Sequence, residues 1–323
     1  MNHRSEPFMS LLEETDHILK QNLKIPESYR IYYVSSATEC WEIIAQSLSK
    51  QLGSYHLFNG AFGKKWYKYS QALTSMANHL EFSPQESAPL SNTLNPEGAV
   101  ICLTQNETSN GSQISTSSIS YFRNEYPENL IAIDATSSMA GINLNFNKAD
   151  IWFASVQKCF GLPSGMAILI CSPRTLEICR NIGEFDHYNS LSFIDENMKR
   201  WQTTHTPNIL GIYLLNKVMS ARNGIEKVEK KIRKRAIEWT DFLEKATNLN
   251  FYIKNHELRS ETVLTLEGVP EFINMLKKKG VEKGLILGNG YGDLKDGTMR
   301  IANFPALKKK EIKYLRDFLI PLI

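Results

Sequence analysis

The segment IWFASVQKCFGLPSG occupies residues 151–165. Its first six residues are apolar or small and have the length of a buried strand, and Lys158 comes two residues later, ahead of a turn that contains glycine and proline. A lysine at such a strand end either extends its ammonium group to solvent or has a chemical use. Lysine loses its proton readily on burial and forms Schiff bases with carbonyl compounds. The segment alone leaves both interpretations open.

Similar strand-like segments recur through the first two thirds of the chain, separated by helical patterns. They span residues 29–34, 54–59, 99–104, 130–134, 151–156 and 164–170, and helices are predicted at about 38–49 and 62–76. Apolar strands that alternate with helices are typical of an α/β fold with a mostly parallel sheet between helices. Ligands of such sheets bind beyond the carboxyl ends of the strands. The residues that follow each strand are therefore the candidates for chemistry.

The last third predicts a smaller α+β domain. Its segments are two helices at 207–222 and 225–246, a strand-like 261–266, a helix near 269–279, a strand-like 298–304 and a final helix at about 308–322. A chain of 323 residues also exceeds the roughly 250 to 300 residues at which one core usually stops growing. We expect a large domain over 1–215 and a small C-terminal domain over 216–323.

Composition excludes several classes of function. The chain has 37 basic and 34 acidic residues, so its net charge of +3 gives no field that would attract nucleic acid or a membrane surface. The basic run at 227–235 has its apolar residues at helical spacing and predicts an amphipathic helix with a solvated face. Five cysteines without a CxxC pair indicate reduced thiols and no metal site. No apolar stretch approaches 18 residues, and we expect a cytoplasmic protein.

Two motifs follow the first two predicted strands. SSATE places the amides of Ala37, Thr38 and Glu39 at a helix N-terminus, where they could bind a phosphate or simply belong to a helix cap. NGAFGKKW places Phe62 between two glycines. That ring could stack on a planar cofactor or begin a helix as a core residue.

Two later strand ends carry further polar groups. QNETSNG offers Thr108 as a hydrogen-bonding residue, although the motif alone is equally an ordinary loop. IAIDATSS ends a buried strand in Asp134, which must find a partner or become neutral because an isolated buried charge is costly. A helix-capping role is the alternative for Asp134.

The order of these motifs resembles the phosphoserine aminotransferases within the class V aminotransferases. The shared features are SSATE, NGAFG, NET, an aspartate that closes a strand ahead of serines, Ala-x-x-Gln-Lys at 154–158, Thr-Pro at 206–207 and a late Met-Arg at 299–300. The similarity spans nearly the whole chain. It implies pyridoxal 5'-phosphate as the cofactor and the fold type I of pyridoxal-phosphate enzymes.

The resemblance also implies roles for individual residues. Lys158 would hold the cofactor as a Schiff base, Asp134 would pair with the pyridine nitrogen, and Phe62 would replace the family's ring-stacking tryptophan. The other implied cofactor contacts are Ala37, Thr38, Glu39 and Gln157 at the phosphate, Thr108 near the ring hydroxyl, and His205 and Thr206 at the phosphate of a neighbouring subunit in a homodimer. The implied substrate residues are His3, Arg4 and Arg300, of which Arg300 would hold the α-carboxylate bidentately.

The implied reaction is amino transfer between glutamate and a small 2-oxo acid, by default 3-phosphohydroxypyruvate in serine biosynthesis. Three departures bear on that substrate. Glu39 stands where the family usually has an arginine, GNGYGD at 288–293 replaces a second His-Arg pair, and the chain begins just ahead of His3, where relatives carry a further segment. Either this lineage lacks that segment or the start is misplaced. GNGYGD lacks the strand, helix and acidic partner of a nucleotide-binding motif.

Three alternatives follow from these departures. Glu39 and the missing pair favour an alanine–glyoxylate or serine–pyruvate type aminotransferase. A cysteine desulfurase is disfavoured, because Phe62 stands where those enzymes stack a histidine and because Cys159 is badly positioned for attack. A truncated, non-catalytic paralogue is disfavoured by the retention of Lys158, Asp134 and Gln157.

Overall fold

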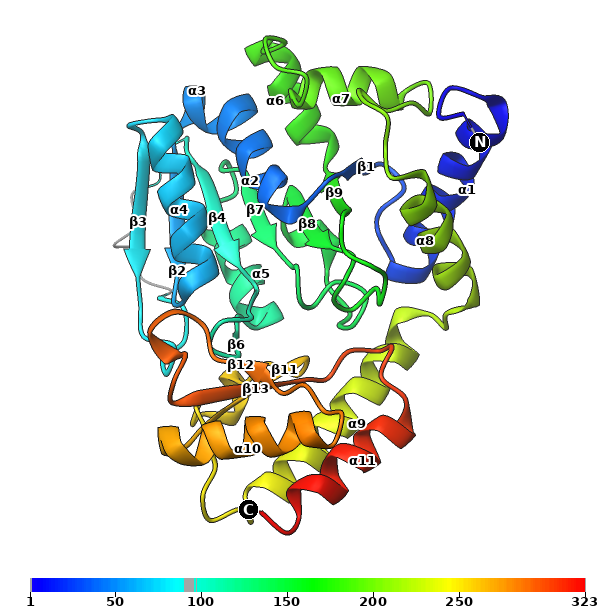
Figure 1. Cartoon of the computed structure of the whole chain (residues 1–323). Helices are drawn as coiled ribbons and strands as arrows, with labels where there is room; N and C mark the ends of the chain where they lie inside the picture. The colour runs from blue at the N-terminus through cyan, green and yellow to red at the C-terminus, as the bar shows by residue number, and fades with distance from the viewer. Residues whose placement is uncertain (1, 90–95, 97, 323) are drawn as a thin grey trace.

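A computed structural model of the chain describes residues 2–89, 96 and 98–322. Figure 1 shows two lobes: a large lobe coloured blue to green around one sheet, and a smaller lobe coloured yellow to red around a second sheet. The carboxyl ends of the central strands of the large sheet point toward the small lobe, so loops from both lobes meet between the two sheets. The predicted α/β architecture with a small α+β lobe is confirmed.

The large sheet has seven strands in the order β1-β9-β8-β7-β4-β2-β3. Its strands are β1 (Arg30–Val34), β2 (Ser54–Phe58), β3 (Ala77–Glu81), β4 (Val100–Thr104), β7 (Ile131–Asp134), β8 (Ile151–Ser155) and β9 (Ala167–Cys171). The run from β3 to β8 is parallel, and only β9 is antiparallel to its two neighbours. β3 was not predicted, because an edge strand with mostly exposed residues lacks the continuous apolar run of the central strands.

Helices cover both faces of this sheet. They are α1 (Glu6–Leu23), α2 (Ala37–Ile44), α3 (Lys50–Leu52), α4 (Ala61–Leu73), α5 (Thr116–Glu125), α6 (Pro173–Ile182), α7 (Leu191–Met198) and α8 (Ile209–Ala221). Several begin with a polar cap; Ser36, Ser115 and Ser172, for example, each accept a hydrogen bond from an amide of the first turn. None of the helices within the described ranges is long and apolar enough to cross a bilayer.

The small lobe packs three helices against an antiparallel sheet of order β10-β11-β13-β12. Its elements are α9 (Ile225–Leu243), β10 (Asn250–Phe251), β11 (Val263–Glu267), α10 (Pro270–Glu282), β12 (Gly288–Asn289), β13 (Thr298–Ala302) and α11 (Lys309–Leu319). The first half of α9 contributes Ile225 and Ile232 to the large core, and Trp239 begins the separate small core. The predicted boundary between residues 215 and 216 therefore falls inside α8, ahead of the point where the two cores separate.

Arg222 lies at the junction of the lobes, directly after α8. Its Nη1 donates a hydrogen bond to the carbonyl of Cys159 at 2.8 Å, and its Nη2 donates to the carbonyl of Phe160, also at 2.8 Å. Burial lowers the pKa of this guanidinium, so carbonyl oxygens replace part of the water it has lost. Arg222 thus fixes the two residues that follow Lys158 to the start of the small lobe.

We predict that Arg222→Ala lowers the stability of the protein. A hydrogen bond to a charged group contributes about 1.5–3 kcal/mol, and the substitution leaves two buried carbonyls without a donor. Thermal unfolding followed by circular dichroism should show a clear fall in the melting temperature. Arg233→Ala is the control, because the Arg233 side chain is 55% exposed and its surface ion pairs contribute at most about 1 kcal/mol. Equal melting temperatures for the two variants would contradict this role of Arg222.

Candidate active site

A cavity of about 210 Å³ lies at the carboxyl ends of the large-sheet strands. It brings together residues that the sequence places far apart. The predicted site residues that line it are Ala37, Thr38, Phe62, Thr108, Asp134, Gln157 and Lys158. A second cavity of about 370 Å³ shares Thr108 and Lys158 and is otherwise lined by the small lobe, including Arg300 and Gly288. Lys158 therefore lies between a pocket of the large lobe and a pocket of the small lobe.

Lys158 follows β8 and is only partly buried. Burial, and to a smaller extent the positive charge of Arg300, lower its pKa. A lowered pKa enlarges the fraction of neutral amine, and the neutral amine is the form that attacks a carbonyl carbon. The chemical use of this lysine thus has a physical basis in the fold.

Asp134 ends β7 and is 4% exposed. Its Oδ1 accepts a hydrogen bond from the amide of Thr136 at 2.9 Å, and its Oδ2 accepts one from Nε1 of Trp41 at 3.4 Å. Within the described part of the chain no basic side chain forms an ion pair with it. Burial raises the pKa of Asp134 to about 6. A cationic ligand group in the cavity would supply the missing partner.

The N-terminus of α2 faces the same cavity through Ala37 and Thr38. Such a terminus favours an anion because its amides and the helix dipole point toward it. Two amides of this terminus already have partners: that of Ala37 donates to Oγ of Ser155 at 3.4 Å, and that of Glu39 donates to Oγ of the cap residue Ser36 at 3.1 Å. The Glu39 carboxylate turns away from the cavity and accepts hydrogen bonds from the Ser35 amide at 2.6 Å and the Tyr188 hydroxyl at 3.2 Å.

Phe62 lies in the first turn of α4, and a buried carboxylate fixes that turn. Glu107 Oε2 accepts a hydrogen bond from the amide of Gly63 at 3.1 Å. A Cβ on Gly60 would lie 2.3 Å from Cγ of Glu107, so only glycine fits there. Gly60 therefore allows the close approach of Glu107, whereas a Cβ on Gly63 would lie 2.4 Å from Cβ of Phe58. The ring of Phe62 lines the cavity.

Arg300 lies on β13 and reaches toward the large lobe. Its Nη1 donates to the carbonyl of Thr108 at 2.9 Å, and its Nε donates to the carbonyl of Asn289 at 2.7 Å. These two hydrogen bonds fix the plane of the guanidinium beside the shared wall of the two cavities. The arrangement can hold a carboxylate next to Lys158.

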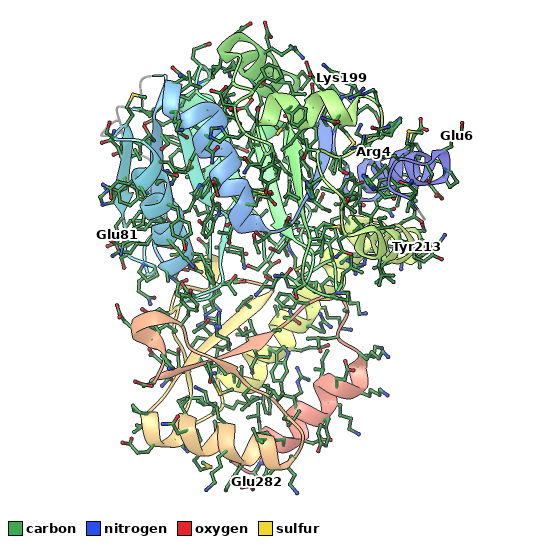
Figure 2. The ribbon with its side chains drawn as sticks, turned by 45° about the horizontal axis from the view of Figure 1, so that its top comes forward. Arg4, Glu6, Glu81, Lys199, Tyr213 and Glu282 are labelled. Carbon is green, nitrogen blue, oxygen red and sulfur yellow. The ribbon has the colours of Figure 1, made fainter. Side chains whose placement is uncertain are left out.

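Five predicted site residues line neither cavity: Glu39, whose contacts are given above, and the four residues His3, Arg4, His205 and Thr206. Figure 2 shows Arg4 near Glu6 at the start of α1, on the outer side of the large lobe and remote from the small lobe that carries Glu282. His205 lies between α7 and α8, with its ring edge-on to Tyr188 at a centroid distance of 6.1 Å. A single chain therefore does not bring these four residues to Lys158.

Sequence reasoning missed several residues at this site, among them Trp41, Lys65 and Tyr291. Trp41 lines the cavity beside Asp134, and its place one helical turn after Thr38 could have indicated this. Lys65 lines the same cavity one turn after Phe62. Tyr291 packs its ring against Phe62 from the small lobe, with centroids 4.7 Å apart. Nothing in the local sequence indicates that last contact.

The donors at this site fit pyridoxal phosphate. Lys158 offers an amine for the aldehyde, Asp134 a buried carboxylate for the protonated ring nitrogen, and the α2 N-terminus a place for the phosphate. Phe62 offers an aromatic face for the ring.

Known proteins similar to this chain point to the same chemistry. Phosphoserine aminotransferases from Rhodococcus opacus and Lactococcus lactis are 25% and 24% identical to it, covering 97% and 98% of this chain and 85% and 89% of their own. The crystal structure of phosphoserine aminotransferase SerC from Cytophaga hutchinsonii is 31% identical, with a TM-score of 0.92 over 100% of this chain and 91% of that one.

More distant structures share the fold. Alanine–glyoxylate aminotransferase from Nostoc is 17% identical, with a TM-score of 0.85 over 100% of this chain and 89% of that chain. The sequence profile of the class V aminotransferases matches residues 1–281. The chain is a pyridoxal-phosphate-dependent aminotransferase and belongs to the class V aminotransferase family.

Proposed function

We propose that this aminotransferase moves an amino group between glutamate and a small 2-oxo acid, and that the acceptor is 3-phosphohydroxypyruvate, which yields phosphoserine for serine biosynthesis. The observation that carries the proposal is the position of Lys158 between the cavity of Asp134 and the cavity of Arg300. Relatives named phosphoserine aminotransferase at 24–31% identity support the choice of acceptor.

The residues of this chain have different roles in the reaction. Pyridoxal phosphate, when bound, supplies an electron sink for the electrons left when the substrate Cα loses its proton. Lys158 holds the cofactor and then carries that proton, a general acid–base role typically worth ~10² to 10⁴ in rate. Asp134 keeps the ring nitrogen protonated, and Arg300 orients the α-carboxylate.

Other residues hold the cofactor in place. Ala37, Thr38, Gln157 and Thr108 line the cavity. Ala37 and Thr38 at the α2 N-terminus, with Gln157 beside the lysine, would bind the phosphate, and Thr108 would contact the hydroxyl side of the ring. Phe62 stacks on the ring. Glu39 contributes to this group only by closing the cap of α2, since its amide and its carboxylate have other partners.

We also propose a homodimer in which His205 and Thr206 reach the cofactor phosphate of the partner subunit, and His3 and Arg4 take part in substrate binding. Their absence from the lining of the chain's own two cavities supports this assignment. Leu210 is 66% exposed and Tyr213 is 44% exposed on the helix that follows Thr206. Exposed apolar side chains of this kind are typical of a subunit interface. The cytoplasmic location stays a prediction.

A specific observation favours a second candidate, an alanine–glyoxylate or serine–pyruvate type activity. The basic side chains that line the two cavities are Lys65, Lys158 and Arg300. Two of them are already assigned to the cofactor and the α-carboxylate, so a phosphate ester needs further cations. A substrate with an uncharged side chain does not. A non-catalytic paralogue is disfavoured because the described site keeps lysine, aspartate and arginine in working positions.

Replacing Lys158 tests the aminotransferase assignment of this site. Purified with pyridoxal phosphate, the wild type should show the visible absorbance of lysine-bound cofactor, and glutamate should convert it to the amine form. Lys158→Ala should lose the band and the conversion, because no other amine is held at that position. Lys64→Ala is the control, since Lys64 is an exposed neighbour paired with Glu81. A wild-type protein that lacks the visible absorbance band would contradict the aminotransferase assignment.

Amino-donor half-reactions test the substrate. Phosphoserine should convert the cofactor more efficiently than serine or alanine. Arg4→Ala should raise the KM for phosphoserine about tenfold or more, because it removes a charged hydrogen-bond donor, and should leave the KM for glutamate unchanged. If phosphoserine does not convert the cofactor but alanine or serine does, the proposed acceptor is wrong and the second candidate activity is supported.

The buried Asp134 predicts a pH-dependent stability of the cofactor-free protein. Its pKa is about 6 in the folded chain and ~3.9 when unfolded, so its contribution is most favourable below pH ~4 and is lost as the pH rises through about 6. Asp134→Asn removes a cost of up to about 3 kcal/mol at pH 8. Melting curves should show the variant more stable than the wild type at pH 8 and equal near pH 4. A pH-independent difference would contradict the assignment of this cost to ionised Asp134.

A further inference from the structure

The GNGYGD loop of the small lobe fixes the position of Tyr291. The amide of Gly290 donates to the carbonyl of Thr298 at 3.2 Å, and Oγ1 of Thr298 donates to the carbonyl of Leu294 at 2.6 Å. A Cβ on Gly290 would lie 2.2 Å from that Leu294 oxygen, so only glycine allows this closure. The backbone of Tyr291 therefore has one well-defined place at the rim of the small lobe.

The Tyr291 ring belongs to the small lobe and packs against a ring of the large lobe. Its centroid lies 4.7 Å from that of Phe62, with 31° between the ring planes. Among the ring pairs of the described residues, this one alone joins the two lobes. Because Phe62 lines the cofactor cavity, Tyr291 limits the orientations that the Phe62 ring can take.

The loop that carries Tyr291 also adjoins Arg300. β12 pairs with β13 so that Gly288 lies opposite Arg300, and Asn289 accepts the hydrogen bond from Nε of Arg300. Burial lowers the pKa of Arg300, and the nearby Glu107 and Tyr291 oppose that shift. Within the described residues neither the Tyr291 hydroxyl nor Nη2 of Arg300 has a hydrogen-bond partner. Nη2 of Arg300 therefore remains available as a donor at the second cavity, and the Tyr291 hydroxyl remains available on the loop that adjoins Arg300.

We propose that Tyr291 is a substrate-binding residue whose hydroxyl donates a hydrogen bond to the carboxylate held by Arg300, and whose ring positions Phe62 against the cofactor. The first half rests on the role of Arg300 in the proposed function; the second half rests only on the ring contact. The loop then gives the site a neutral donor for a carboxylate. It adds no positive charge for a second anionic group.

Two substitutions separate the hydroxyl from the ring. Tyr291→Phe keeps the ring, and Tyr291→Ala removes both. The first readout is the dissociation constant of pyridoxal phosphate, from quenching of protein fluorescence. The second is the dissociation constant of glutarate, an unreactive dicarboxylate of glutamate's chain length, from calorimetry on the loaded protein. Tyr314→Phe is the matched control, because it removes a tyrosine hydroxyl of the same lobe that bonds only the carbonyl of Lys283.

Tyr291→Phe should weaken glutarate about tenfold and leave the cofactor constant unchanged, as expected for a lost hydrogen bond to a charged group. Tyr291→Ala should weaken both, the cofactor by roughly two- to tenfold for a lost aromatic contact. Tyr314→Phe should change neither. If Tyr291→Ala does not fold, Tyr291→Leu keeps apolar bulk without the ring and carries the same expectation.

The possible failures are distinguishable. Unchanged glutarate affinity in Tyr291→Phe, while Arg300→Lys loses it, overturns the hydroxyl role and leaves the proposed function intact. Wild-type glutarate affinity in Arg300→Lys refutes the proposed role of Arg300 and the hydroxyl role with it. Unchanged cofactor affinity in the ring-deleting variant overturns the positioning role, whatever the substrate proves to be.

Discussion

The active site depends on a buried carboxylate for which the described residues of the chain supply no cationic partner. Asp134 lies at the end of a strand whose every residue is buried, and its two hydrogen bonds come from the Thr136 amide and the Trp41 indole. Neither donor carries a charge, so desolvation outweighs them and raises the pKa. Burial of the Asp134 carboxylate costs free energy of folding. A cationic ring nitrogen in the cavity would offset that cost.

Burial also shifts the pKa of Lys158, but in the opposite direction. Burial raises the pKa of Asp134 and lowers that of Lys158, so both groups are shifted toward their neutral forms. Two shifted groups at neighbouring strand ends are characteristic of active sites. Arg222 and Glu107 then hold the segments that carry Lys158 and Phe62, which keeps the reacting groups from relaxing away from the cavity.

The sequence predicted the part of the site that strand ends determine. Asp134 and Lys158 stand out because a charged residue directly after a buried strand must lie where ligands of an α/β sheet bind. Tyr291 did not stand out, since its role comes from a contact between elements distant in the chain. The fold of the large lobe was predictable for the same reason as the strand ends, because apolar runs of strand length decide the central strands. The edge strand β3 lacks that pattern.

The residues that we propose to act across subunits are a different case. His3 and His205 match family motifs but do not line the two cavities of their own chain. Their proposed roles therefore rest on the family resemblance and not on the geometry of a single chain. The sequence also does not indicate where the two cores separate. The amphipathic pattern of α9 is continuous, although its two halves pack on different cores.

Charge around the two cavities links substrate choice to assembly. Lys65, Lys158 and Arg300 are balanced there by Asp134 and Glu311, and the cofactor phosphate adds a charge of about −1.5 to −2. The α2 N-terminus offsets roughly half a charge of that. A second phosphate on the substrate would leave the site strongly negative unless cations arrive from outside this chain's cavities. An uncharged substrate side chain requires no such addition. In the proposed homodimer, recognition of a phosphorylated acceptor would therefore require cations from the partner subunit, while amino transfer to a simple 2-oxo acid would depend chiefly on the lysine, aspartate and arginine of one subunit.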